Sequence, residues 1–343
     1  MIAWLLISFA VMMVLGVPIG ISLGLSAMGG IIFLDGGSLV TVTQRMFEGM
    51  NSWALLAVPL YTFAGYTMSK GGISKRLMDF CYSIVGHIYG GLAHVNVLAS
   101  MIFAGISGSA VADTAGVSGM FMPEMVRKGY SKELSVTVTA VSSTIGIIIP
   151  PSIPMVVYAM LTGASVGALF MAGMVPGVLL AVALCVYVYF VAKKRNYPRT
   201  APPKLRDYLL YLTKSIWAML TPVILLVGIY TGIMTPTEAG AIAGLYALLV
   251  SFLIYRLMSW RTLKQVLVDT MKGTGSVSIM IGAASAISFI FAKEQIGTIL
   301  GNWLVESCGW NEYLVTVMNM LLNFVTEYLF DTFVVFRGSM DTN

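Results

Sequence analysis

Long apolar stretches separated by short charged clusters recur along this chain from Ile2 to Val325. Several are long enough to cross the roughly 30 Å hydrocarbon core of a bilayer as helices. The pattern predicts an all-α polytopic membrane protein with about ten membrane segments. We expect spans within 3–34, 53–68 and 168–191, an arm helix at 72–90, and further spans after a linker at 196–212. No charge precedes Asp35, so we expect the first span to be retained and not cleaved as a signal peptide.

Two apolar regions are interrupted in ways that a simple span does not tolerate. Residues 92–126 contain the run Ala104-Gly105-Ile106-Ser107-Gly108-Ser109, which is a poor helix interior. Residues 133–166 contain Pro150, Pro151 and Pro154, and three prolines in five residues cannot remain helical. We therefore predict a re-entrant helical hairpin at 92–126 and a broken helix at 133–166.

Composition and charge agree with this prediction. The 343 residues are 58% hydrophobic and only 10% charged, so water is not the main solvent of the folded chain. Lys and Arg gather around Lys70, Arg127, Lys193 and Arg261, and the positive-inside rule places all four clusters in the cytoplasm. The first two clusters can share a side only if the region between them returns as a hairpin.

Weak internal similarity suggests two repeats of opposite orientation. Pro18 and Pro236 begin similar segments, as do Lys70 and Lys293, and the predicted topology places the first member of each pair inside and the second outside. Inverted repeats of this kind build many secondary transporters around a site at mid-membrane. We expect a first repeat at 1–195 and a second, incomplete repeat at 213–343.

The interrupted helices are where chemistry is expected, because backbone freed from helical bonding needs other partners in lipid. Carbonyls and hydroxyls there are hard oxygen ligands for sodium, and short-helix N-termini favour an anion. We expect ion binding at Ser107, Gly108, Ser109, Ser142, Ser143, Thr144, Gly146 and Pro150, and substrate binding at Pro151, Ser152, Ser276 and Ser285. The alternative is that both interruptions are kinks that serve helix packing.

Other polar residues carry weaker signals. Asp113 follows the hairpin tip and is either a gate or ion neighbour or a helix-capping carboxylate. Pro236 and Glu238 follow Thr235, and we expect them to cap a helix. His87 and His94 are a poor metal site and are expected at an interface, and Cys81, Cys185 and Cys308 form no pair. We expect no cofactor and no metal other than sodium.

Three blocks together resemble a known family. They are Ala104 to Asp113, Ile147 to Ser152 (Ile-Ile-Ile-Pro-Pro-Ser), and Gly232 to Ala239. They are similar to the large membrane subunit, DctM type, of tripartite ATP-independent periplasmic (TRAP) transporters, over Met1 to about Leu322. The resemblance implies an elevator-type fold and sodium-coupled uptake of a small organic anion such as a C4-dicarboxylate or sialic acid. It also implies a small DctQ-type membrane subunit, a periplasmic DctP-type binding protein and a bacterial inner membrane, with no nucleic acid partner.

The sequence after Leu322 departs from that pattern. A second hairpin is due near Phe330, but Glu327, Asp331 and Arg337 occur there instead. We therefore expect a truncated chain that inserts in a membrane and does not transport, and a non-transporting assembly partner stays an alternative. An intramembrane enzyme is a further alternative, although Asp113 has no second aspartate to form a catalytic pair.

Overall fold

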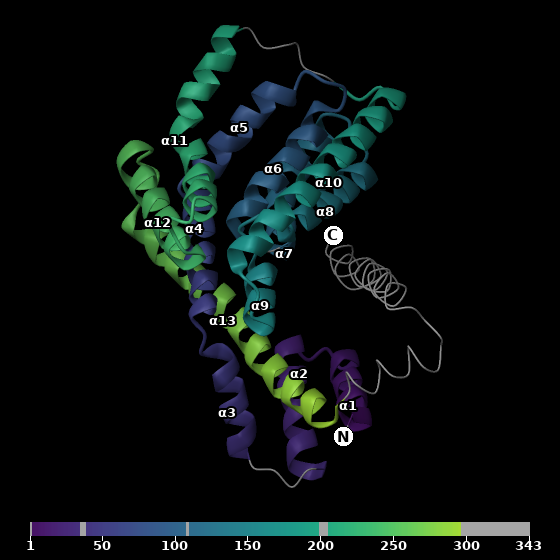
Figure 1. Ribbon diagram of the computed structural model, residues 1–343. Coiled ribbons are helices and arrows are strands. Elements are labelled where there is room, and N and C mark those ends of the chain that lie inside the picture. The colour runs from purple at the N-terminus through teal and green to yellow at the C-terminus, as the bar shows by residue number, and fades with distance from the viewer. Residues whose placement is uncertain (1, 35–38, 108–109, 199–204, 296–343) are drawn as a thin grey trace. The chain divides into compact units, whose positions relative to one another are not determined.

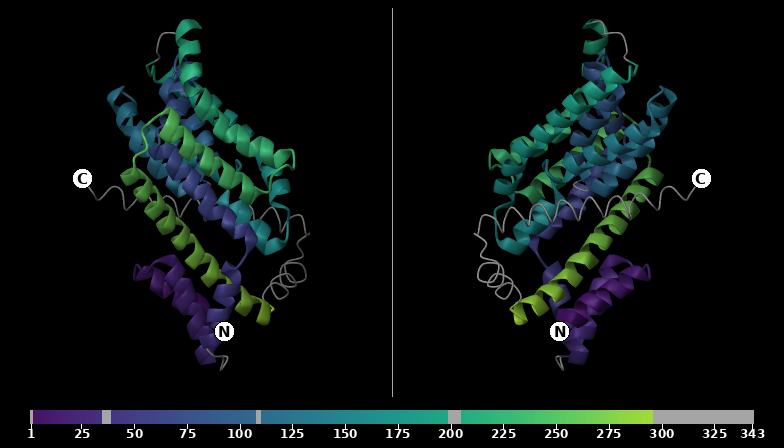
Figure 2. Two further views of the ribbon diagram at one scale, coloured as in Figure 1. Left: turned by 90° about the vertical axis from the view of Figure 1, so that its left-hand side faces the viewer. Right: turned by 90° about the vertical axis from the view of Figure 1, so that its right-hand side faces the viewer.

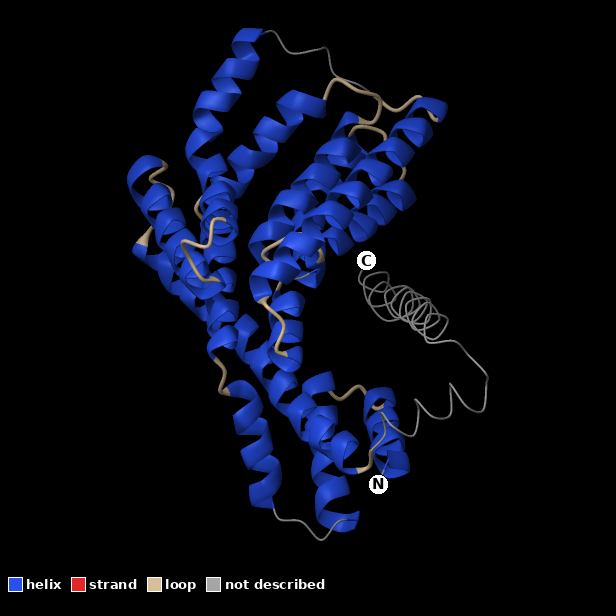
Figure 3. Ribbon diagram, in the orientation of Figure 1, coloured by secondary structure: helices blue, strands red, loops and turns tan. Residues whose placement is uncertain are grey.

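The computed structural model describes residues 2–34, 39–107, 110–198 and 205–295. All regular structure in these ranges is helical, which confirms the all-α prediction (Figure 3). Four of the described helices are long and apolar enough to cross a membrane: Val166–Lys194, Tyr208–Tyr230, Pro236–Ile254 and Trp260–Lys293. The chain divides into a terminal unit, Met1–Gly49 with Met280–Asn343, and a central unit, Met50–Ile279.

The terminal unit begins with two helices where the sequence predicted spans within 3–34. Helix α1 covers Ile2–Val14, and α2 covers Ile19–Gly29 and continues into a π-helical segment at Gly30–Leu34. Residues 3–34 therefore form two helices and not one continuous helix. The chain turns at Gly16, whose φ of 77° suits glycine, and Pro18 has no N–H with which to continue α1.

The rest of the described terminal unit is helical too. Helix α3, Leu39–Met50, has no counterpart in the sequence prediction, and the last residues of α13, Trp260–Lys293, complete the unit. Ala27 and Ile31 from α2, with its π-helical segment, form an apolar core with Ala286, Ile287 and Ile290 of α13. Small residues allow this approach, because a Cβ atom at Gly24 of α2 would lie 3.8 Å from Cβ of Ala283.

In the central unit a second pair of helices packs in the same manner. A 3-10 turn at Trp53–Leu56 precedes α4, Ala57–Lys70, which lies against α12, Pro236–Leu249. Gly240 and Gly244 of α12 meet Tyr61 and Phe63 of α4, and the Tyr61 hydroxyl donates a hydrogen bond of 2.6 Å to Pro236 O. As α2 does, α12 continues into a π-helical segment, Val250–Ile254.

Two helices flank this pair. Helix α5, Ile73–Val85, lies in the predicted arm and packs against α11, Leu205–Tyr230. Helix α11 begins inside the stretch that the sequence analysis assigned to a linker at 196–212, so that linker is shorter than predicted. Only its first part carries the helix-breaking prolines, and Leu205 to Leu212 are mostly good helix formers.

The remaining helices of the central unit form a bundle around the interrupted regions. They are α6, Gly91–Ser107; α7, Ala110–Arg127; α8, Lys132–Thr144; α9, Ile153–Thr162; and α10, Val166–Lys194. Figures 1 and 2 show α6, α7, α8 and α10 side by side. A shared apolar core runs through these four helices and includes Val97, Val117, Val138 and Val188.

Candidate functional site

The break between α8 and α9 frees backbone carbonyl groups. Helix α8 ends at Thr144, a 3-10 turn covers Ile145–Ile147, and α9 starts at Ile153. In a continuing α-helix, the carbonyls of Gly146 and Ile147 would accept from residues 150 and 151, which are prolines without an N–H. Both carbonyls must therefore find other donors or positive charge.

Ser152 supplies one of the missing donors. Its buried hydroxyl donates to Ile147 O at 2.6 Å, and its oxygen accepts from the backbone N–H of Met155 at 3.3 Å. This second bond makes Ser152 the N-cap of α9. The hydroxyl is thus committed to holding the break together, and the positive end of the α9 dipole starts directly after it.

Ser142 and Ser143 are fully buried at the last turn before the break. The Ser143 hydroxyl donates to Thr139 O at 2.7 Å, and the Ser142 hydroxyl shares a hydrogen bond of 2.7 Å with Ser100 Oγ on α6. A hydroxyl that donates one bond keeps lone pairs that can face a cation. Thr144 differs, since its hydroxyl bonds to Val141 O on an exposed face of α8.

Sequence reasoning missed a polar seam that joins α6 to α8. Asn96, fully buried on α6, donates to Thr139 Oγ1 at 2.7 Å, and Ser100 meets Ser142 one turn further along. Among the described residues, Asn96 Oδ1 has no hydrogen-bond partner. The spacing of four residues between Asn96 and Ser100 on an otherwise apolar helix is the signal that would have found the seam.

Helix α10 supports the break from another side through two glycines. A Cβ atom at Gly173 would lie 2.3 Å from the carbonyl oxygen of Ile148, and one at Gly177 would lie 2.3 Å from Cγ1 of Ile149. Real Cβ atoms do not approach so closely, so glycine at 173 makes room for the unwound backbone and glycine at 177 makes room for the Ile149 side chain. Gly173 and Gly177 do not stand out in the sequence, because glycine is common in membrane helices.

The predicted hairpin tip lies mostly outside the described residues. Gly108 and Ser109 fall in a gap, and Ser107 and Asp113 belong to α6 and α7 although their side chains are not described. The other end of the two helices is described. The hydroxyl of Tyr130, just after α7, lies beside the backbone amides of Leu92 and Ala93 at the start of α6. The two helices therefore start and finish at the same end of the bundle.

The two predicted serines of α13 fall in different units of the chain. Ser276 lies on an exposed face of α13 within the central unit, and no described hydrogen bond links it to the broken helix. Ser285 belongs to the terminal unit, where its hydroxyl faces the surface of Gly49 on α3. Their assignment to substrate binding stays a prediction.

Glu238 forms a capping box at the start of α12. Thr235 N–H donates to Glu238 Oε2 at 2.7 Å, and Glu238 N–H donates to Thr235 Oγ1 at 3.3 Å, with Pro236 at the first helical position. A cavity of about 390 Å³ lies beside these residues and is lined also by Trp53, Val156 and Val166. The carboxylate of Glu238 would repel an anion there, so we do not assign this cavity to the substrate.

His94 is buried between α6 and α10, and its predicted place at the membrane interface stays a prediction. Its Nδ1 lies 3.0 Å from Gly90 O and its Nε2 lies 3.0 Å from Cys185 O. Both partners are carbonyl oxygens, which only accept, so a neutral ring donates a hydrogen bond to one of them. Within the described ranges, no group of three or more His, Cys, Asp or Glu side chains has the arrangement of a metal site.

The arrangement suits a hard monovalent cation better than bond-making chemistry. Freed carbonyls and buried hydroxyls at residues 142–152 are neutral oxygen donors, which match the oxygen preference of hard cations. A nucleophile would need an adjacent base. The described hydrogen bonds of Ser142, Ser143 and Ser152 run instead to another serine, to backbone carbonyls and to a backbone N–H.

Comparison with known proteins identifies the family. The chain matches the family model of the DctM component of the tripartite ATP-independent periplasmic transporter over residues 6–336. It is 35% identical to the sialic acid TRAP transporter large permease protein of Vibrio cholerae, over 95% of this chain and 75% of that protein. It is 39% identical to the C4-dicarboxylate TRAP transporter large permease protein of Pseudomonas aeruginosa, over 88% of this chain and 70% of that protein.

The family match extends further toward the C-terminus than the sequence predicted. The resemblance was expected to stop near Leu322, whereas the family model reaches residue 336 and so includes Glu327 and Asp331. The family match thus continues through this stretch, and residues 296–343 lie outside the described part of the structure. The chain belongs to the DctM family, the large permease component of tripartite ATP-independent periplasmic transporters.

Proposed function

We propose that this permease couples the import of a small organic anion to sodium, and that the break between α8 and α9 holds the ion. The observation that carries the proposal is the pair of carbonyls, Gly146 and Ile147, that two prolines leave without helical donors. Because the chain belongs to this family, it is a transporter subunit, and the alternative of an intramembrane enzyme is ruled out. Sodium fits the donors, because Ser143 and Ser142 add buried hydroxyl oxygens at the same turn.

The substrate we propose is a carboxylate. Relatives are named for sialic acid, C4-dicarboxylates and 2,3-diketo-L-gulonate, and each of these compounds carries a carboxylate group. In this chain, the N-terminus of α9 directs its dipole toward the break, and a carboxylate is stabilised at such an end. We propose that Pro151 and Ser152 shape this end, with the sodium ion offsetting the negative charge of the substrate.

Reciprocal packing supports the proposal of two related repeats. The turn at Gly16, α2 and its π-helical segment resemble the turn at Gly232, α12 and its π-helical segment. In the central unit α12 packs on α4, and in the terminal unit α2 packs on the end of α13, which is the predicted counterpart of α4. We propose an elevator mechanism in which the bundle of α6 to α10 carries ion and substrate across the membrane.

We propose that the chain works with two partners in the bacterial inner membrane. A tripartite transporter has three components, and this chain is the large permease. The other two would be a small membrane subunit of the DctQ type and a periplasmic binding protein of the DctP type. The binding protein would deliver the anion to the outer face. We propose transport by this assembly in place of the expected inactive fragment, because the family match continues through residue 336.

Replacing Ser143 with alanine is expected to raise the sodium concentration for half-maximal uptake roughly tenfold, the effect of about 1.4 kcal/mol. The reason is the loss of a buried oxygen at the break, while Thr139 O still accepts its helical bond. The measurement is the uptake of a carboxylate for which a relative is named, such as sialic acid or a C4-dicarboxylate, into proteoliposomes. Uptake is recorded while the sodium concentration is varied.

Ser83→Ala is the matched control for this variant. Ser83 is also buried and also donates to a backbone carbonyl within its own helix, Phe80 O at 2.7 Å, but it lies on α5. Its sodium dependence should equal that of the parent chain. An unchanged sodium requirement in Ser143→Ala, or an equal change in both variants, would remove the ion from this break.

A further inference from the structure

An apolar groove runs along the outside of the bundle between α6 and α10. Its volume is about 530 Å³, and its walls include Leu98 and Met101 of α6 and Val178, Val182 and Phe190 of α10. Several of these side chains face outward, with Val182 54% and Phe190 65% exposed. His94 lies in the wall, with its ring nitrogens 3.0 Å from the carbonyl oxygens of Gly90 and Cys185. The groove therefore offers a ligand almost only apolar contact.

The length of the groove matches one leaflet of a bilayer. Its residues on α10 run from Val178 to Phe190, and at 1.5 Å per residue this corresponds to about 18 Å of helix. Half of the hydrocarbon core is about 15 Å. A single acyl chain that lies in the groove would thus reach from mid-membrane to the headgroup level at the C-terminal end of α10.

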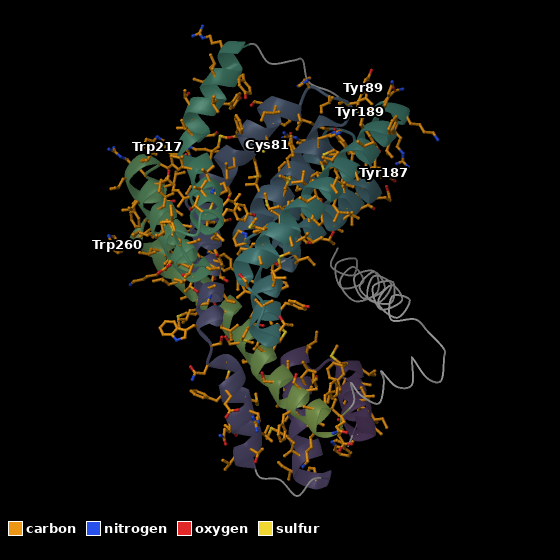
Figure 4. The ribbon with its side chains drawn as sticks, viewed as in Figure 1. Cys81, Tyr89, Tyr187, Tyr189, Trp217 and Trp260 are labelled. Atoms are coloured by element: carbon orange, nitrogen blue, oxygen red, sulfur yellow. The ribbon has the colours of Figure 1, made fainter. Side chains whose placement is uncertain are left out.

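That end carries aromatic and basic side chains suited to the headgroup region. Tyr89 and Tyr189 form an edge-to-face pair with centroids 6.4 Å apart, and Figure 4 shows Tyr187 on the same part of α10. Tyr and Trp concentrate at this level of a membrane. Groove residues Tyr189 and Phe190 are followed one helical turn later by Lys193 and Lys194, so both lysines continue the lining face of the groove.

The charges around these lysines leave them available to an anion. Lys193 lies over the ring of Tyr189, with Nζ 6.0 Å from its centroid. Arg195 points elsewhere, to Ser131 and Tyr197, and it also interacts with Glu133. Glu124 pairs with Arg127 and Lys128 at the end of α7. The described carboxylates in this region therefore face other cations, and the end of the groove keeps a positive charge.

We propose that this groove is a binding site for an anionic phospholipid. One acyl chain lies between α6 and α10, and the phosphate group is held by Lys193 and Lys194 at the end of α10. Charge complementarity selects an anionic headgroup over a zwitterionic one, and the leaflet-long apolar wall selects a lipid over a free anion. The bound lipid would rest on Cys185 and Val182.

The test is native mass spectrometry of the detergent-purified full chain with added phosphatidylglycerol or phosphatidylethanolamine. Removing both charges, by Lys193→Gln with Lys194→Gln, is expected to weaken phosphatidylglycerol binding about fivefold for each lysine and to leave phosphatidylethanolamine unchanged. Filling the groove, by Val182→Trp, is expected to remove the binding of both lipids. Neither expectation depends on whether the protein transports sodium.

Two controls make these changes specific. Lys264→Gln with Lys272→Gln removes the same charge from exposed positions of α13, and Leu179→Trp adds the same ring to an exposed position of α10 outside the groove lining. Both should bind lipid as the parent does. Equal losses in the test and control variants would overturn the proposal. So would retained lipid in Val182→Trp.

Discussion

Alanine at Gly173 is expected to weaken sodium-driven uptake at least tenfold. The added Cβ would lie 2.3 Å from the carbonyl oxygen of Ile148 and 2.5 Å from Cε of Met155. The methionine can move, but the carbonyl belongs to backbone that two prolines hold in place. Displacement by several tenths of an ångström exceeds the tolerance of about 0.2 Å that metal coordination allows.

Gly167→Ala separates this effect from a general change in α10. Gly167 lies on the same helix, and its nearest neighbour to an added Cβ is Ser165 Oγ at 3.8 Å, an ordinary contact. In open space the change from glycine to alanine stabilises a helix by about 0.5–1 kcal/mol. We therefore expect Gly167→Ala to insert and transport as the parent does. Parental sodium affinity in Gly173→Ala would show that the close contact between Gly173 and the Ile148 carbonyl does not hold the ion site in place.

Cysteines placed at Lys75 and Lys132 are both expected to react with a membrane-impermeant thiol reagent from the cytoplasm only. Both positions are exposed, and α6 and α7 lie between them. Tyr130 lies beside the first amides of α6, and Lys128 after α7 donates to the Tyr82 hydroxyl on α5 at 2.8 Å. The chain thus leaves α7 next to where it entered α6, which is the geometry of a hairpin and not of one crossing.

Ile233→Cys gives the opposite side for comparison. Ile233 is 75% exposed in the turn between α11 and α12, which the charge pattern places outside. A background without Cys81, Cys185 and Cys308 removes the native thiols. Reaction at position 233 from outside and at 75 and 132 from inside is the expected all-or-none result. Labelling of position 132 from outside would remove the hairpin, and with it the inverted repeat.

The sequence predicted features whose cause is local. Pro150 and Pro151 cannot donate hydrogen bonds, so the end of α8 near Gly146 and the restart at Ile153 follow from covalent structure alone. The capping box at Thr235 and Glu238 follows from a motif with a similarly local mechanism. The composition sufficed for an all-α membrane fold, because lipid leaves helices as one of few ways to satisfy the backbone.

Features that depend on tertiary contact were not predictable in this way. Asn96 and Ser100 matter because Thr139 and Ser142 on another helix meet them. Gly173 matters because an unwound segment touches it, and nothing in the sequence around it says so. The early start of α11 was missed for a different reason, since the charges near Leu205 suggested a solvated linker although the residues favour helix.

Uptake driven by a sodium gradient tests the central proposal most directly. Proteoliposomes that contain this chain with its small membrane subunit would receive the binding protein loaded with a labelled carboxylate on the outside. An inward sodium gradient should drive accumulation of the anion above its outside concentration, and dissipating the gradient, or replacing sodium with potassium, should abolish accumulation. Accumulation that is equal with and without sodium, or none with the complete assembly, would contradict sodium coupling through the α8–α9 break.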